Sequence, residues 1–138
     1  MDSKDKKIIQ ELKKDSRSSV RDIAKATKIR PSTVHQRIVK LKESGVIEKF
    51  TVKLNNQLTE ENFIVFMFVS TEADLPKIAF NDDHVKEVFG ITGEYDLVFK
   101  LKFRDVEDFN EYILKFRKET GIRKTITMVA TTTLKEEI

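Results

Sequence analysis

Residues 19–47 constrain the fold more than any other stretch of the chain, because they predict two short amphipathic helices joined by a tight turn. Ser19 and Asp22 form a capping-box pattern, which predicts the start of the first of these helices. Its apolar residues recur on one face and are expected to pack inward; they are Val20, Ile23 and Ala24.

The second helix is predicted to begin at Pro31, because a proline in the first helical turn leaves no N–H unpaired. Val34, Ile38 and Leu41 recur at helical spacing, and Gly45 is placed to end the helix. A helix with this pattern suits insertion into the major groove of DNA, although two amphipathic helices and a turn also occur in any small helical bundle. The residues on or beside the opposite, mainly polar face are Ser32, Thr33, His35, Gln36, Val39, Lys40 and Glu43.

The distribution of charge favours the DNA-binding interpretation. Residues 1–53 contain 15 Lys and Arg against 7 Asp and Glu, a net charge of +8. The other 85 residues contain 11 Lys and Arg against 16 Asp and Glu, a net charge of −5. The basic N-terminal part is therefore expected to bind a polyanion such as double-stranded DNA, whereas the acidic remainder is not expected to contact DNA.

The length of 138 residues and the change of charge near residue 54 favour two small domains over one. No run of the sequence approaches the roughly 20 apolar residues that cross a bilayer, and the charged N-terminus lacks the apolar core of a signal peptide. There is no cysteine, which excludes a disulfide framework and a thiolate metal site. We therefore expect a cytoplasmic protein with no membrane partner, no metal and no cofactor.

Residues 1–54 are predicted to form a winged helix-turn-helix domain. A first helix over residues 3–14 precedes the two helices described above and is expected to bury Ile8, Ile9 and Leu12. Residues 46–54 alternate well enough to predict a strand pair, or wing. Lys49 and Lys53 would then lie near the phosphate backbone and contribute affinity without reading sequence.

Residues 63–138 are predicted to form a ferredoxin-like domain after a linker over residues 55–62. Residues 63–69 are an unbroken apolar run, which indicates a strand buried on both faces. The complete order of elements is βαββαβ, so the fold class is α+β, with a winged helix-turn-helix followed by a ferredoxin-like domain. The later elements are a short helix opened by Asp74, Leu75 and Pro76 that includes Ile78 and Phe80, strands over 85–91 and 95–103, a helix from Val106 that ends near Gly121, and a strand over 124–134.

The apolar strand over residues 63–69 also predicts an interface. In a ferredoxin-like domain the helices cover only one face of the sheet, so an apolar second face is normally covered by another molecule. We infer a homodimer packed sheet against sheet, which would carry two recognition helices to two successive major grooves.

Residues 92–96, of sequence TGEYD, join the second and third predicted strands of the chain as a hairpin. Gly93 permits a backbone conformation with positive φ, which a tight hairpin often requires. On the residues alone, Gly93 and Asp96 are expected simply to make this turn, with Asp96 bonding nearby backbone N–H groups.

The whole chain resembles the Lrp/AsnC, or feast/famine, family of prokaryotic transcriptional regulators. The N-terminal residues that carry the resemblance are, in order, Asp5 to Ile9, Ile23 and Ala24, Val34, Arg37 and Ile38, Leu41, and Gly45 to Ile47. Arg30 departs from the family, whose members commonly place a capping Ser there, and losing that cap costs about 1 kcal/mol. The resemblance and the helical pattern together imply DNA contacts from Arg30, Ser32, Thr33, His35, Gln36, Arg37, Lys40, Lys49 and Lys53.

The TGEYD loop carries the second part of the resemblance. In the family the matching loop lines an amino-acid effector site between subunits, and many members assemble further into octamers. A carboxylate such as that of Asp96 suits the α-ammonium group of an amino acid, and open backbone N–H groups suit its carboxylate. The helix after the first strand looks about a turn shorter than in the family, with a turn at Asn81 to Asp83. The implied effector-binding residues are Gly93, Glu94, Tyr95, Asp96, Val106, Met128 and Ala130.

Two other functions are compatible with parts of this pattern. Some relatives of the family are sirohaem decarboxylases that use His and Arg in the sheet domain, but His35 and His84 are expected to be solvated polar residues. No phosphate-binding loop, nucleophile elbow or metal-ligand cluster is present in the sequence, so we expect no catalytic residues. An architectural protein that coats DNA without sequence preference is the other alternative, and it would differ from a regulator by similar affinity for any sequence.

Overall fold

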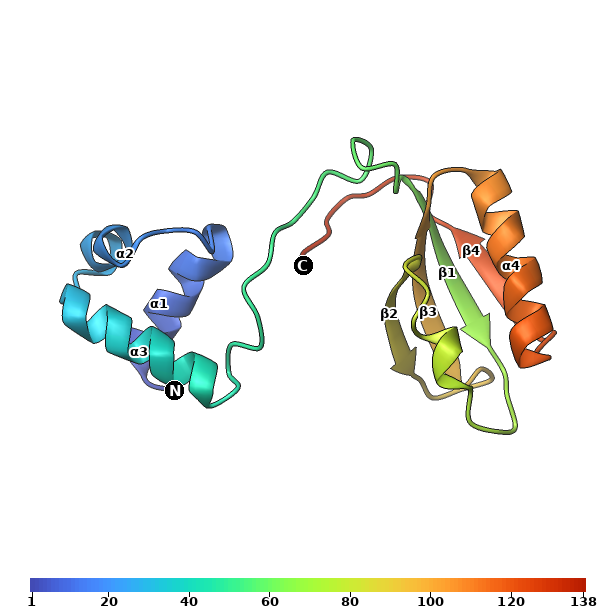
Figure 1. The fold of residues 1–138 in the computed structure, drawn as a ribbon, viewed down its shortest axis with the longest axis horizontal. Coiled ribbons are helices and arrows are strands. Elements are labelled where there is room, and N and C mark those ends of the chain that lie inside the picture. The colour runs from blue at the N-terminus through green and yellow to red at the C-terminus, as the bar shows by residue number, and fades with distance from the viewer. The chain divides into compact units, whose positions relative to one another are not determined.

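The computed structural model describes residues 1–138, which divide into two compact units (Figure 1). The first unit holds Met1–Lys53 together with the terminal Ile138, and the second holds Leu54–Glu137. No helix in either unit combines the length and the apolar character that a membrane span requires.

The first unit contains three α-helices, α1 (Ser3–Lys14), α2 (Val20–Thr27) and α3 (Pro31–Glu43). Ser19 caps α2 as predicted, because its side chain accepts a hydrogen bond from the N–H of Asp22 at 3.0 Å. A full capping box, which was not predicted, starts α1: the side chain of Asp2 accepts from the N–H of Asp5, and the side chain of Asp5 accepts from the N–H of Asp2. All three predicted helices are confirmed.

The core of the first unit is built from the predicted apolar faces. Buried side chains from the three helices meet there, with Leu12, Val20 and Ile38 packed against them, whereas the predicted core residue Ile9 is only half-buried. Ile29 also belongs to this core although it lies in the turn between α2 and α3. Lys28, which precedes it, adopts φ = +58°, and this left-handed residue turns the chain sharply enough to bring Ile29 inward. The buried members of the cluster are Ile8, Ile23, Ala24, Ile29 and Val34.

The strand pair predicted over residues 46–54 is absent. Gly45 ends α3 with φ = +81°, but residues 46–54 form no strand. An extended segment becomes a strand only when a neighbouring row of N–H and C=O groups pairs with it, and this segment has no such neighbour. The alternating apolar residues of this segment are accordingly exposed, among them Phe50 and Val52. One side-chain bond, from the hydroxyl of Ser16 to the carbonyl of Thr51 at 2.9 Å, ties the segment to the helices.

The second unit is a four-stranded antiparallel sheet with one helix. The strands are β1 (Phe63–Val69), β2 (Val85–Gly90), β3 (Leu97–Phe103) and β4 (Thr125–Val129), in the order β2-β3-β1-β4. Helix α4 (Val106–Thr120) links β3 to β4, begins at the capping Asp105 and ends at Gly121, where φ is +72°. The predicted α+β class and the ferredoxin-like element order are confirmed.

Strands β2 and β3 are one and two residues shorter than predicted, and two other elements of this unit differ more. The first helix is a single 3₁₀ turn, η1 (Lys77–Ala79), because Pro76 precedes it directly and the Asn81–Asp83 turn follows it. The last strand ends at Val129 rather than residue 134. The N–H of Ala130 still donates to the carbonyl of Ile64 at 2.9 Å. Because β4 runs antiparallel to β1 and β1 begins at Phe63, residues beyond Ala130 have no strand to pair with.

The hydrophobic core of the second unit lies on one face of the sheet, and Figure 1 shows α4 lying along the sheet. The residues of β1 and β3 that point to this inner face include Val65, Met67 and Phe99, all fully buried. The outer face is less covered: Phe66 is 37% exposed and Phe89 is 58% exposed. The prediction that β1 is buried on both faces is therefore wrong for the single chain. The buried members of the core are Val65, Met67, Val69, Ala79, Phe99, Leu101, Phe103, Tyr112, Ile113 and Phe116.

Candidate nucleic-acid interface and effector loop

The outer face of α3 is available to a partner. Its apolar stripe faces the core, with Val34 and Leu41 buried, and this fixes which side chains point outward. The predicted contact residues on the opposite side of the helix are exposed, except for Thr33, which is half-buried. The exposed residues are Ser32, His35, Gln36 and Lys40.

The N-terminus of α3 lacks a side-chain cap. Arg30 occupies the N-cap position and makes no capping hydrogen bond, which confirms the expected loss of the cap, and Pro31 occupies the first turn. Some N–H groups of this turn are therefore free to bind an anion, and the exposed guanidinium of Arg30 adds positive charge beside them.

Arg37 does not point outward with the other predicted contact residues. Its guanidinium pairs with Asp2 and with Asp5, the latter at 3.3 Å, so it joins α3 to the first turn of α1. Mainly because Arg37 donates a hydrogen bond to it, the pKa of Asp2 is lowered to about 2. The acidic residues spaced three apart at the start of α1 were the sequence signal for this pairing.

Lys49 and Lys53 are exposed in the extended segment that follows α3. They do not lie on paired strands, since none forms over residues 46–54. Both ammonium groups remain on the basic first unit, where they add to the positive potential around α3.

The TGEYD loop forms the hairpin turn between β2 and β3, and Gly93 has φ = +113° as its sequence position suggested. The carboxylate of Asp96 accepts a hydrogen bond from the N–H of Thr71 at 2.8 Å. The N–H of Asp96 donates to the carbonyl of Val69 at 2.9 Å, and its carbonyl accepts from the N–H of Ile91 at 2.9 Å. Asp96 thus fastens the hairpin to the end of β1, which is the structural role expected from the residues alone.

The other residues of the loop are placed differently from one another. Glu94 is exposed, whereas Tyr95 is half-buried beside Phe68, with ring centroids 6.1 Å apart. The ammonium of Lys124 lies 5.8 Å from the centre of the Tyr95 ring, within the range of a cation–π contact.

The remaining predicted effector residues lie away from the loop along the sheet, Met128 at its middle and the other two toward its opposite end. The TGEYD loop adjoins the end of β1 at Val69, whereas Ala130 bonds to Ile64 near the start of that strand. Met128 pairs with Phe66 in the middle of β1. Val106 begins α4 three residues after Phe103, which pairs with Phe63 at the start of β1. One chain therefore does not bring Val106, Met128 and Ala130 together with residues 93–96.

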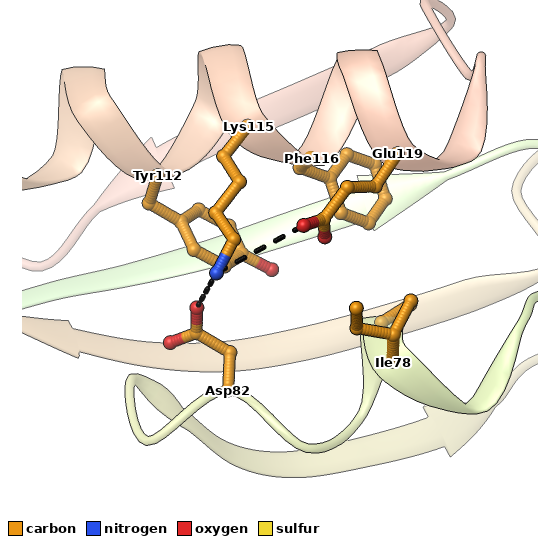
Figure 2. A pocket seen from close by; sticks show the side chains of 7 residues that line it. Ile78, Asp82, Tyr112, Lys115, Phe116 and Glu119 are labelled. Atoms are coloured by element: carbon orange, nitrogen blue, oxygen red, sulfur yellow. Dashed lines mark ion pairs between the residues drawn. The ribbon is translucent and has the colours of Figure 1, made fainter.

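A small cavity lies between α4 and the segment that holds η1 and the Asn81–Asp83 turn (Figure 2). Its volume is about 10 Å³, which is room for one water molecule and too little for an amino acid. In Figure 2 the ammonium of Lys115 points between the carboxylates of Asp82 and Glu119, at 3.7 and 3.9 Å. This cavity is therefore not an amino-acid site.

His84, expected to be a solvated residue, is half-buried and bonded on both sides. Its Nδ1 lies 2.7 Å from the carboxylate of Asp82, and its Nε2 lies 3.1 Å from that of Asp108. Partial burial raises the pKa of Asp82, but the hydrogen bonds from His84 outweigh burial and leave that pKa below its usual value. The imidazole also stacks on Phe103, so its role is to join β2 to α4, and the solvated interpretation is wrong. His35 is exposed as expected.

Comparisons with known families agree with this arrangement. Residues 1–48 match the winged helix-turn-helix DNA-binding family, and residues 80–138 match the Lrp/AsnC ligand binding domain. The chain is 36% identical to an uncharacterized HTH-type transcriptional regulator of Pyrococcus horikoshii, over 99% of this chain and 95% of that protein. It is 34% identical to the HTH-type transcriptional regulator FL11 of Pyrococcus abyssi, over 99% and 93% of the two chains.

Solved structures share the fold. An AsnC family transcriptional regulator from Agrobacterium tumefaciens superposes with a TM-score of 0.93 at 22% identity, covering 99% of this chain and 94% of that one. A transcriptional regulator of Neisseria meningitidis in complex with L-Met superposes with a TM-score of 0.88 at 20% identity, with the same coverage. The chain thus belongs to the Lrp/AsnC family and is a transcriptional regulator in which a helix-turn-helix DNA-binding region precedes an Lrp/AsnC ligand-binding domain.

Proposed function

We propose that α3 is the recognition helix of this regulator and that it reads a specific DNA sequence. The exposed polar face of α3 on a basic unit carries this proposal. Gln36 and Lys40 read base edges, because an amide pairs with adenine and an ammonium with guanine in the major groove. Ser32, Thr33 and His35 make neighbouring base or phosphate contacts. Phosphates are held by Arg30, Lys49 and Lys53.

Arg37 has a different role in this proposal. Its ion pairs with Asp2 and Asp5 support an assignment as a positioning residue, which fixes α3 against α1. The domain that binds DNA spans residues 1–54, and the domain that pairs and senses spans residues 63–138. The division of the chain between Lys53 and Leu54 supports this boundary.

The test of sequence reading is Gln36→Ala in the full chain, with Gln10→Ala, an exposed glutamine of α1, as the matched control. Gln36→Ala is expected to lose about 1–3 kcal/mol of binding to the best DNA site and to relax the preference at one base position. Gln10→Ala is expected to bind as the unaltered chain does. If Gln36→Ala kept the DNA affinity and the base preference of the unaltered chain, α3 would not be the recognition helix.

The working unit in this proposal is a homodimer in the cytoplasm. The uncovered apolar residues on the outer face of the sheet support it, because apolar side chains gathered on one surface normally mark an interface. A second copy packed on this face buries them and pairs two DNA-binding units. Sedimentation of the full chain at micromolar concentration measures this directly, and a monomer there would contradict it. The apolar outer-face residues are Phe66, Phe68, Phe89, Val98, Ile126 and Met128.

The effector site in this proposal lies between subunits and takes a small amino acid. Its support is that residues 93–96 lie at one end of the sheet, whereas Met128 lies at its middle and Val106 and Ala130 toward the other end, so two chains are needed to combine them. The complex of the related Neisseria regulator with L-Met points to the same ligand class. An effector acts by binding one assembly more tightly than another.

Thermal melting against the twenty amino acids tests the sensing role. Asp96→Asn is the informative variant, because an amide oxygen can still accept the Thr71 N–H while the charge that pairs with an α-ammonium is gone. We expect the melting shift of the active amino acid to be lost in Asp96→Asn, with DNA binding of the unliganded protein kept. No shift with any amino acid at millimolar concentration would leave Asp96 with its turn-anchoring role alone.

A further inference from the structure

The C-terminal segment closes a charged cluster on the outer face of the sheet, which we call the Glu136 cluster (Asn56, Lys100, Lys102 and Glu136). The carboxylate of Glu136 lies 2.5 Å from the ammonium of Lys100 and 3.0 Å from that of Lys102. The amide of Asn56 donates to Glu136 at 3.0 Å and accepts from Lys102 at 2.8 Å. Each of the three charged side chains is less than one-fifth exposed.

The register of the sheet places this cluster beside the apolar surface that the proposed dimer uses. One row across the sheet reads Glu87, Lys100, Phe66 and Met128. The next row is entirely apolar and reads Phe89, Val98, Phe68 and Ile126. On the other side, Lys102 pairs with Ile64. A molecule packed on the apolar rows therefore lies directly against the two lysines.

Glu136 is the principal counter-charge for both lysines. Lys100 and Lys102 are two residues apart on one strand, so their side chains emerge on the same face at about 7 Å spacing. The only other carboxylate paired with either is that of Glu87, which lies 3.7 Å from Lys100 and is itself 45% exposed. Mainly because Lys100 donates a hydrogen bond to it, the pKa of Glu136 is lowered to about 2, so the carboxylate is ionised throughout the neutral range.

We propose that Glu136 makes the outer face competent to pair with a second copy of this chain. In a two-fold interface each copy contributes the same surface, so the lysines of both copies lie at the interface. Removing their shared carboxylate leaves little-exposed ammonium groups to be desolvated by the partner, which is costly. The inference rests on the dimer of the proposed function and adds to it a residue on which pairing depends.

The experiment compares Glu136→Gln with Glu137→Gln in the full chain by sedimentation over a range of concentrations. Glu137→Gln removes the same charge one position away. The carboxylate of Glu137 pairs with Lys135 at the exposed surface. Glu136→Gln is expected to raise the dimer dissociation constant at least about tenfold, because both copies lose the counter-charge. Glu137→Gln is expected to dimerise as the unaltered chain does. The triple variant Lys100→Gln, Lys102→Gln, Glu136→Gln is expected to regain pairing, because no unbalanced ammonium remains.

Each outcome decides a different claim. Equal dimerisation of Glu136→Gln and the unaltered chain would overturn the role of Glu136 while leaving the dimer standing. A monomeric unaltered chain would overturn the dimer itself and this inference with it. A triple variant that stays as weak as Glu136→Gln would contradict the charge explanation. Circular dichroism checks the fold of each variant, and Glu136→Asp, which withdraws the carboxylate by one methylene, replaces Glu136→Gln if the latter does not fold.

Discussion

Arg37 is a residue of α3 whose side chain contacts another helix. It lies in α3 among exposed polar residues, yet its guanidinium pairs with Asp2 and Asp5 of α1. Helical periodicity alone gives the direction of a Cα–Cβ bond, whereas a long side chain at the edge of a face turns toward the nearest opposite charge. The orientation of α3 therefore depends on a contact that its own pattern does not reveal.

Replacing Arg37 by Met is expected to lower the thermal stability of the protein and to weaken binding to all DNA sequences alike, because the recognition helix is less firmly held. Selected DNA should keep the same consensus. Binding assays on the best site and on a scrambled site measure this, with Arg17→Met, an exposed arginine outside α3, as control. A changed consensus in Arg37→Met would instead make Arg37 a direct base contact.

The Asp2–Arg37 pair also predicts a pH dependence. The pKa of Asp2 is depressed to about 2, so its stabilising effect is present above the unfolded value near 4 and is lost as pH falls toward 2. The melting temperature of the unaltered chain is therefore expected to fall more steeply between pH 4 and pH 2 than that of Asp2→Asn. Parallel curves for the two proteins would show that the pair contributes nothing to stability.

At the scale of elements, local signals predicted the structure well and missing partners account for the errors. Caps, proline and glycine set the ends of α2, α3 and α4, because these signals act within one or two turns. The predictions of a strand pair over residues 46–54, of a full first helix in the second unit and of a longer β4 were wrong, since each depends on partners that lie outside the local sequence. The candidate site shows the same contrast between local and long-range features. The exposed face of α3 could be predicted from helical periodicity, but the distance between Asp96 and Met128 along the sheet could be known only from the pairing of the strands.

The uncapped N-terminus of α3 gives a test at this scale. Arg30→Ser is expected to stabilise the protein by about 0.5–1 kcal/mol, because a serine side chain at the N-cap accepts a hydrogen bond from a free N–H of the first turn. Ser19→Ala, which removes the existing cap of α2, is the opposite control and is expected to destabilise by a similar amount. Denaturant unfolding measures both. If Arg30→Ser also weakens DNA binding, Arg30 holds a phosphate; a destabilised Arg30→Ser would contradict the account of the helix start.

At the scale of the whole molecule, a basic unit that presents the exposed polar face of α3 is joined to a second unit whose sheet presents an uncovered apolar face. A single helix reads only a few base pairs, so affinity for an extended site depends on linking two of them. In the proposed function the two units are therefore complementary: the first supplies the contacts with DNA, and the second supplies the pairing that lets two sets of contacts act together.

Phe89→Glu tests this dependence in the full chain. Phe89 is 58% exposed on the outer face, and a carboxylate there is expected to oppose pairing and to weaken DNA binding at least tenfold, or about 1.4 kcal/mol, without altering α3. Leu114→Glu is the matched control, because Leu114 is 65% exposed on α4 and lies away from that face. Sedimentation and gel shift on the same samples give both quantities. A monomeric Phe89→Glu that binds DNA as tightly as the unaltered chain would separate pairing from DNA binding.

The central claim is that paired copies of α3 read a specific DNA site. Selection of bound fragments from random and genomic DNA by the full chain measures this most directly. We expect an inverted-repeat consensus whose half-sites lie about 34 Å apart, one helical turn, or a multiple of it, and we expect Gln36→Ala to lose the preference at matching positions in both halves. Recovery of fragments with no shared sequence, or of a consensus that Gln36→Ala leaves unchanged, would contradict the claim.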